Sequence, residues 1–128
     1  MNAPSPAKVL IADDEIFMLR LLEATLRKGG YEVIQCHDGQ EALAAAASTR
    51  PQLIVMDVMM PGLDGLAAVR RLKQDEATRA IPVIVLSSRG HALTQLEAEQ
   101  AGAALFLTKP FSPTQLLQTA RSLIGPPP

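Results

Sequence analysis

The sequence has almost no aromatic side chains and no apolar stretch long enough to cross a membrane. Phe, Tyr and Trp make up 3% of the 128 residues, and tryptophan is absent, so aliphatic side chains must fill the interior. No apolar run approaches the roughly 20 residues of a membrane-spanning helix. The start of the chain also lacks the apolar segment of a secretion signal. These absences predict a soluble, cytoplasmic domain without a membrane partner.

An excess of one charge is missing too. The 12 Lys and Arg residues nearly balance the 13 Asp and Glu residues, so no bulk charge would draw the chain to nucleic acid. The single Cys36 cannot form an internal disulfide, which fits a reducing compartment. An apolar fraction of 48% is enough for a packed core in a chain of this size. We expect one domain over residues 8–125, a flexible start at 1–7 and a tail or linker start at 126–128.

Short apolar runs alternate with longer stretches of helical periodicity. Residues 53–56 and 83–86 are apolar at every position, which is typical of parallel strands covered on both faces. The expected strands are Lys8–Ala12, Tyr31–Cys36, Gln52–Asp57, Pro82–Ser87 and Ala104–Thr108. Five strand–helix units predict an α/β fold. We expect a doubly wound, five-stranded parallel sheet of the flavodoxin-like type, with the strand order 2-1-3-4-5.

Helix signals fill the intervals between these runs. Asp38, Asp64 and Ser112 are each expected to cap a helix, because a short oxygen-bearing side chain can accept a bond from a backbone N–H there. The first helix is expected at about Glu15–Lys28, ending at Gly29. Its buried face is expected to contain Ile16, Leu19, Leu22 and Leu26.

Five polar residues fall at the carboxyl ends of the expected strands. Asp13 and Asp14 follow the first strand, and Asp57 ends the third. Ser87 ends the fourth strand, and Lys109 follows the fifth. Open α/β sheets bind ligands at this edge, so the three aspartates should converge.

Convergence of carboxylates requires a compensating positive charge. Two carboxylates about 5 Å apart repel by roughly 3 kcal/mol at an effective dielectric near 20. Mg²⁺ prefers oxygen ligands and bridges carboxylates to phosphate oxygens. Carboxylates, Mg²⁺ and the lysine at position 109 together describe a phosphoryl-transfer centre. Each residue alone has an ordinary explanation, such as a helix cap or a surface lysine, but five at one sheet edge favour a functional site.

Four segments occur in an order that matches a known family. They are Val9–Asp14, Met56–Gly65, Pro82–Ser88, and Ala101–Ala103 followed by Lys109–Phe111. Together they resemble the response-regulator receivers of bacterial two-component signalling, with the CheY-like proteins closest in size. The resemblance implies a switch that receives a phosphoryl group from a sensor histidine kinase or a histidine phosphotransfer protein. It implies a self-phosphorylating signalling protein rather than an enzyme.

The same resemblance implies roles for the acidic residues. Asp57 would be the nucleophile and form an acyl phosphate. Asp14 and Asp57, with the backbone carbonyl of Met59, would bind Mg²⁺ directly. Asp13 would act through a metal-bound water. Met59 and Arg89 would also flank the path of an attacking water, which predicts slow autodephosphorylation.

Further implied roles concern the switch itself. Ser87 would donate its hydroxyl to the phosphoryl group, and Lys109 would pair with it. The Lys109–Pro110 peptide bond would be cis. Phe106 matches an aromatic switch position, and phosphorylation would be read by an output protein on the surface of the fourth helix, fifth strand and fifth helix.

Other functions make different demands on the residues. A phosphatase of the haloacid-dehalogenase type needs a second aspartate two residues after the first, where this chain has Met59. A flavin or dinucleotide binder needs a glycine-rich loop after the first strand, where this chain has Asp13 and Asp14. A receiver that only docks would not need all five site residues. A receiver cut from a longer regulator with a C-terminal output domain remains an alternative, because 125–128 could begin a linker.

Overall fold

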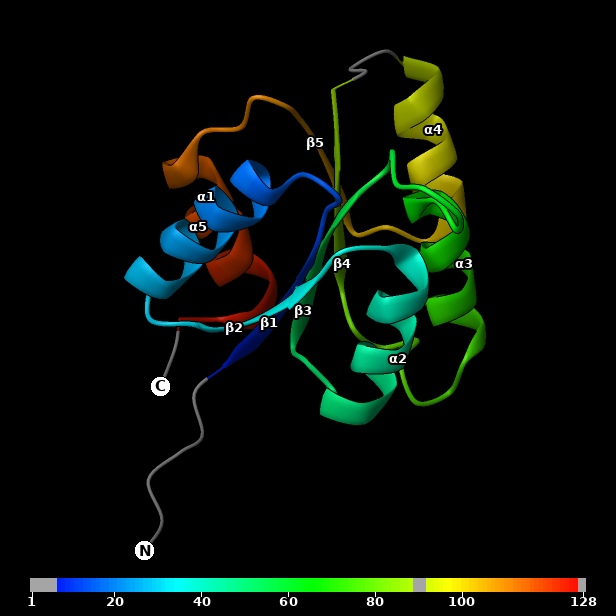
Figure 1. Ribbon diagram of the computed structural model, residues 1–128, viewed down its shortest axis with the longest axis horizontal. Helices are drawn as coiled ribbons and strands as arrows, with labels where there is room; N and C mark the ends of the chain where they lie inside the picture. Colours follow the sequence, from blue (N-terminus) through cyan, green and yellow to red (C-terminus); the bar gives the residue numbers. More distant parts are fainter. Residues whose placement is uncertain (1–6, 89–91, 127–128) are drawn as a thin grey trace, which may run out of the picture.

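Five parallel strands form a single sheet with helices on both faces, in a computed structural model that describes residues 7–88 and 92–126 (Figure 1). The strands are β1 (Lys8–Ala12), β2 (Glu32–Cys36), β3 (Leu53–Asp57), β4 (Val83–Ser87) and β5 (Leu105–Thr108). The helices are α1 (Ile16–Lys28), α2 (Gly39–Thr49), α3 (Gly65–Gln74), α4 (Ala92–Ala101) and α5 (Pro113–Ile124). The sheet order is β2-β1-β3-β4-β5, which confirms the predicted doubly wound fold.

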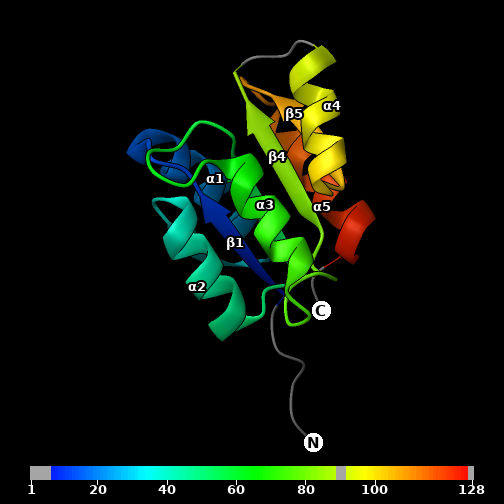
Figure 2. The ribbon, with the colours of Figure 1, turned by 90° about the vertical axis from the view of Figure 1, so that its right-hand side faces the viewer.

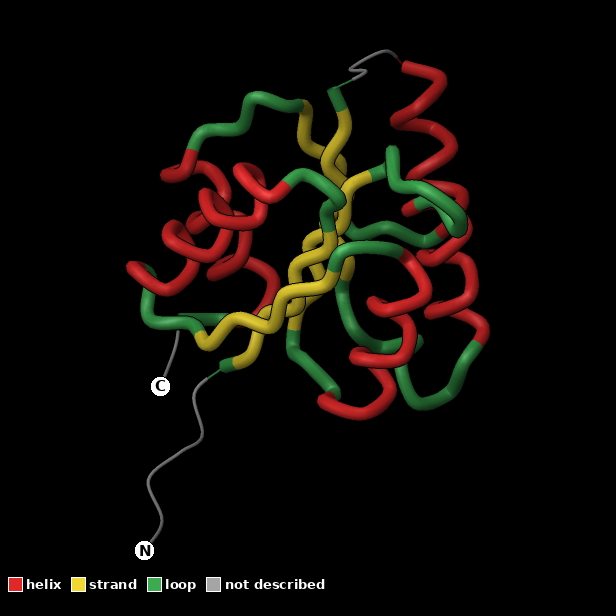
Figure 3. The backbone as a smooth tube through the Cα atoms, viewed as in Figure 1, coloured by secondary structure: helices red, strands yellow, loops and turns green. Residues whose placement is uncertain are grey.

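Two helical layers enclose the sheet. Helices α1 and α5 cover one face, and α2, α3 and α4 cover the other (Figures 1 and 2); the strands run between these layers (Figure 3). Every residue of β3 and β4 is buried, which is why these segments are apolar almost throughout. In β1, Leu10 packs in the core beneath α2 and α3, whereas Val9 and Ile11 pack in the core beneath α1 and α5. These two cores fix the positions of the strand ends, and with them the polar residues that follow.

The predicted helix signals are confirmed. The side chains of Asp38, Asp64 and Ser112 each accept a backbone N–H from three residues later, at 2.8, 2.8 and 3.3 Å. Gly29 ends α1, and Gly102 follows α4 with a φ of 107°, a conformation that glycine adopts readily. Within residues 7–88 and 92–126, none of the helices has the length and hydropathy needed to cross a bilayer.

One prediction for α1 was wrong. Ile16 is 56% exposed, although Leu19, Leu22 and Leu26 are buried as expected. At 3.6 residues per turn, Ile16 lies roughly a quarter turn from the centre of the buried face. It therefore starts the helix, after the cap residue Glu15, without contributing to its core contacts.

Four strands also begin one residue later than expected. Tyr31, Gln52, Pro82 and Ala104 precede β2, β3, β4 and β5 rather than starting them. The N–H of Gln52 still donates to the carbonyl of Lys8 at 2.9 Å. Residues at the ends of a strand can still bond to the neighbouring strand, so the exact first residue of a strand is poorly defined.

Candidate functional site

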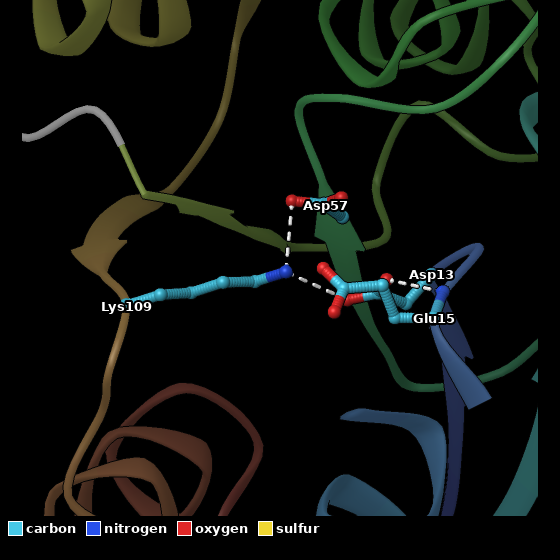
Figure 4. Close-up of polar contacts among 4 residues, drawn as sticks. All are labelled: Asp13, Glu15, Asp57 and Lys109. Atoms are coloured by element: carbon cyan, nitrogen blue, oxygen red, sulfur yellow. Dashed lines mark hydrogen bonds and ion pairs between the residues drawn. The ribbon is translucent and has the colours of Figure 1, made fainter. Parts of the chain in front are cut away.

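Two aspartates and a lysine meet at the carboxyl edge of the sheet (Figure 4). Asp13 follows β1, Asp57 is the last residue of β3, and Lys109 follows β5. The Nζ atom of Lys109 lies 2.9 Å from Oδ2 of Asp13 and 3.2 Å from Oδ1 of Asp57. With Asp14, these aspartates place one carboxylate oxygen each within 4.8 Å of one another. The predicted convergence of the three aspartates is confirmed.

The three carboxylates differ in their surroundings. Asp13 is fully buried, Asp57 is 4% exposed, and Asp14 is exposed. Both oxygens of Asp13 already accept bonds, because its Oδ1 accepts the backbone N–H of Glu15 at 2.9 Å and its Oδ2 accepts Lys109. Asp13 is thus held rigidly, whereas Asp14 presents its carboxylate to solvent at the mouth of the site.

Burial and charge set the protonation of the site. The pKa of Asp57 is raised to about 6, mainly by burial and also by the neighbouring charge of Asp13, while Lys109 partly offsets both effects. Burial alone would lower the pKa of Lys109, but its bonds to Asp13 and its attraction to Asp57 raise it above the ordinary value. At neutral pH the lysine is therefore cationic and Asp57 is ionised. The ionised form of Asp57 is the one that can act as a nucleophile.

Ser87 lies next to this group at the end of β4. It is fully buried, and its backbone carbonyl accepts the N–H of Lys109 at 2.8 Å. Its backbone pairs with Thr108 in the ladder between β4 and β5. Phe106 lies on β5, two residues before Thr108. It is partly buried against the core beneath α2 and α3 that also contains Leu10. The peptide bond between Lys109 and Pro110 is cis, as predicted.

The loop after β3 forms the open side of the site. Met59 is 52% exposed and, with Asp14 and Pro61, lines a hollow of about 560 Å³ beside the aspartates. The loop is closed at its base, because the N–H of Gly65 donates to the carbonyl of Val58 at 3.0 Å. The other residue expected to flank the path of water, at position 89, lies outside the described residues.

Two glycines near the site were not identified from the sequence. A Cβ atom on Gly65 would collide with the backbone carbonyl oxygen of Asp57, and one on Gly39 would collide with the carbonyl oxygen of Leu63. Both glycines directly follow a capping aspartate, at Asp38 and Asp64, and occupy the first position of a helix. Glycine is unfavourable within helices, so the repeated Asp-Gly pair was the available signal of close backbone contact.

Comparisons with known proteins agree with this geometry. A family described as "Response regulator receiver domain" matches residues 9–121. The chain is 43% identical to the response regulator PleD of Caulobacter vibrioides over 117 residues, covering 91% of this chain and 26% of PleD. It is 35% identical to Protein PilH of Pseudomonas aeruginosa over 119 residues, covering 93% of this chain and 98% of PilH. The chain thus spans about a quarter of the length of PleD, and about half of the length of several other curated relatives.

Solved structures show the same arrangement. The chemotaxis protein CheY4 of Vibrio cholerae superimposes with a TM-score of 0.88 at 34% identity, covering 93% of this chain and 99% of CheY4. A receiver domain of a sensor histidine kinase from Pseudomonas aeruginosa, described with a magnesium ion coordinated in its active-site cleft, has a TM-score of 0.88 at 31% identity. That match covers 94% of this chain and 99% of the kinase receiver.

Proposed function

Because this chain belongs to the response-regulator receiver family of two-component signalling, we propose that its Asp57 accepts a phosphoryl group from a phosphohistidine on a histidine kinase or phosphotransfer protein. The transfer would depend on Mg²⁺ held by the acidic cluster, and the modified protein changes its affinity for an output partner. The observation that carries this proposal is the group of three carboxylates within 4.8 Å, two of which contact the ammonium group of Lys109.

The donor set fits a magnesium ion. Asp14 is exposed, and one of its carboxylate oxygens lies within 4.8 Å of a carboxylate oxygen of Asp57. These two carboxylates would hold the ion, together with the backbone carbonyl of Met59. Both oxygens of Asp13 are engaged by other groups, which suits contact through a water molecule. When bound, Mg²⁺ neutralises charge on the phosphate oxygens.

The residues around Asp57 suit in-line phosphoryl transfer. The carboxylate oxygen of Asp57 attacks the phosphorus, a P–O bond forms, and the bond to the donor imidazole breaks. Lys109 already lies 3.2 Å from Oδ1 of Asp57 and would then pair with the phosphoryl oxygens. Ser87 supplies a hydroxyl donor from the adjacent strand end. The phosphoryl group stays on the protein, which thereby switches its own conformation.

Incubation with a small acyl phosphate and Mg²⁺ is expected to add one phosphoryl group to the protein, without any kinase. The reason is that the site itself holds the nucleophile, its counterion and the metal ligands. Intact-mass analysis measures the product, and hydroxylamine should remove it because it is an acyl phosphate. The Asp57→Asn variant should stay unmodified. Modification of this variant would place the acceptor elsewhere and contradict the proposal.

The acyl phosphate is expected to persist, because the apolar side chain of Met59, which is 52% exposed, would shield it from water. Replacing Met59 by asparagine, which can position a water molecule, should speed hydrolysis about tenfold, or about 1.4 kcal/mol in the barrier. The Met59→Leu variant keeps an apolar cover and should hydrolyse at the wild-type rate. Decay of the phosphorylated protein can be followed by mass analysis. Equal rates in all three proteins would exclude shielding by this side chain.

Phosphorylation is expected to change the surface formed by α4, β5 and α5. Movement of Ser87 toward the phosphoryl group would vacate space beside β5, into which the partly buried Phe106 can turn. Fuller burial of a phenylalanine contributes roughly 1.5–3 kcal/mol, whereas shifting an equilibrium from 1:99 to 99:1 requires about 5.5 kcal/mol. New bonds from Ser87 and Lys109 must therefore provide the remainder.

This coupling predicts a correlated NMR response. On addition of a phosphoryl mimic, the ring signals of Phe106 should shift together with the backbone amides of α4 and α5. The Ser87→Ala variant should reduce both responses, because it removes the hydroxyl that draws the loop toward Asp57. A response confined to residues near Asp57 would exclude this route to the output face.

The setting of the domain follows from the same proposal. Residues 8–125 form the receiver, whereas most of the start predicted at 1–7 and of the tail or linker predicted at 126–128 lies outside the described residues. The protein acts in the cytoplasm, where kinase domains and phosphotransfer proteins supply phosphohistidine. Its output partner is either a separate protein or a domain joined after the receiver, as the length of relatives such as PleD suggests. Neither nucleic acid nor membrane is contacted directly by the receiver.

A further inference from the structure

A short turn between β2 and α2 contacts both sides of the acidic site. This β2–α2 turn consists of residues 36–39 and carries none of the groups proposed to react. At one end, the backbone carbonyl of Cys36 accepts the N–H of Asp13 at 3.2 Å. At the other end, Gly39 lies against the backbone of Leu63. The turn therefore bridges the loop that carries Asp13 and Asp14 and the loop that carries Met59.

The contact at Gly39 leaves no space for a side chain. A Cβ atom there would collide with the carbonyl oxygen of Leu63 and would lie 3.2 Å from its carbonyl carbon and Cβ. Two of these three atoms belong to the backbone, so rotation of a side chain cannot relieve the collision. Gly39 is itself buried, and the 2.8 Å bond between Asp38 Oδ1 and the N–H of Glu41 fixes the start of α2 beside it.

The loop that Gly39 touches is anchored at both ends. It starts directly after Asp57 and is closed at its base by the bond between Gly65 and Val58. A displacement at Leu63 is therefore expected to spread through residues 58–65. That stretch includes Met59, whose carbonyl is a proposed metal ligand.

We propose that the β2–α2 turn is a positioning element that sets the distance between Asp14 and the carbonyl of Met59, and so tunes the affinity for Mg²⁺. This inference rests on the proposed function of the site as a magnesium-dependent phosphoryl acceptor. Mg²⁺ requires near-ideal octahedral geometry, so small displacements of the loop should weaken binding. Gly39 is a positioning residue and has no contact with the reacting groups.

The alternative is that Gly39 has only a structural role and allows α2 to pack. Measuring the affinity for Mg²⁺ distinguishes this role from the positioning of metal ligands. The Gly39→Ala variant should bind Mg²⁺ at least tenfold more weakly by isothermal titration calorimetry, under conditions where circular dichroism shows a folded protein. Ala44→Gly is the matched control, because it exchanges the same two residue types at an exposed position of α2. It should bind Mg²⁺ within twofold of the wild type.

A second pair of variants tests the turn without a collision. Asp38→Ala and Asp38→Asn both remove the negative charge, but only asparagine retains a strong helix cap. The alanine variant should bind Mg²⁺ several-fold more weakly than the asparagine variant. This pair decides the question if Gly39→Ala does not fold.

The outcomes separate this inference from the proposed function. If the wild type does not bind Mg²⁺, the metal part of the proposed function fails. If the wild type binds Mg²⁺, but a folded Gly39→Ala binds it equally well, positioning by the turn is overturned. Equal affinities for the two Asp38 variants overturn it as well.

Discussion

Replacing Asp57 by asparagine is expected to stabilise the metal-free protein at pH 7, although it removes the proposed phosphoryl acceptor. Burial and the nearby charge of Asp13 raise the pKa of Asp57 from its ordinary 3.8 to about 6 in the folded state. The folded protein therefore holds this proton more tightly than the unfolded chain does. Ionisation of Asp57 therefore costs no stability below pH 3.8, costs increasingly more as pH rises toward 6, and at pH 7 costs about 3 kcal/mol. Asparagine cannot ionise and avoids this cost.

Urea unfolding between pH 4 and 8 in the presence of EDTA measures the effect. Across this range the free energy of unfolding of the wild type should fall relative to that of Asp57→Asn. The difference between the two proteins should shrink when Mg²⁺ is added, because the metal strongly stabilises only the site with an ionised Asp57. The Asp38→Asn variant removes a carboxylate outside the cluster and should follow the wild-type pH dependence. An Asp57→Asn variant that was less stable than the wild type at pH 7 without metal would contradict the assigned electrostatics.

Loss of Lys109 should have the opposite effect. Its ammonium group contacts Asp13 and Asp57, both of which are buried. Lys109→Met preserves much of the side-chain volume but leaves these carboxylates without the contact. Removing one partner of a buried ion pair costs about 3–5 kcal/mol, and a loss of this size is expected in EDTA at pH 7. Mg²⁺ should restore a large part of it by supplying another positive charge beside Asp57.

Lys73→Met provides the comparison for this variant. The Nζ atom of Lys73 donates to the backbone carbonyls of Arg79 and Ile81 at 3.1 and 2.7 Å. Lys73 lies in the last turn of α3, whereas Asp57 precedes the start of that helix. Its removal should also destabilise the protein, but Mg²⁺ should not restore the loss. Urea unfolding with and without Mg²⁺ distinguishes the two lysines. A loss in Lys109→Met that Mg²⁺ left unchanged would mean that this lysine does not act as the counterion of the site.

The sequence allowed the fold and the acidic site to be predicted, because both depend on local patterns. Strands apolar at every position indicated a sheet covered on both faces, and its strand order then brought Asp13 and Asp57 together. The exposure of Ile16 at the start of α1 was harder to predict. Its side chain is of a type that is usually buried, but its position around the helix axis points it away from the core. Such positions depend on how the helix is docked.

Contacts between loops were also beyond local patterns. The engagement of both Asp13 oxygens depends on a backbone N–H and on Lys109, which is 96 positions away in the chain. The close approach of Gly39 to Leu63 likewise joins two loops that are unrelated in sequence. The Asp-Gly pairs signalled that space was limited at two helix starts, but they did not identify the neighbour.

The burial of Cys36 at the end of β2 has a practical use in labelling. Burial, together with the nearby charges of Glu41 and Asp38, raises the pKa of its thiol to about 12, so almost no thiolate is present at pH 7–8. Maleimides and nitroxide reagents react with the thiolate, and this sole cysteine should remain unmodified in the folded protein. A second cysteine at exposed Leu96 or Leu105 would then accept a fluorophore or spin label selectively. Movements of the output face could be recorded by spectroscopy without first removing the native cysteine.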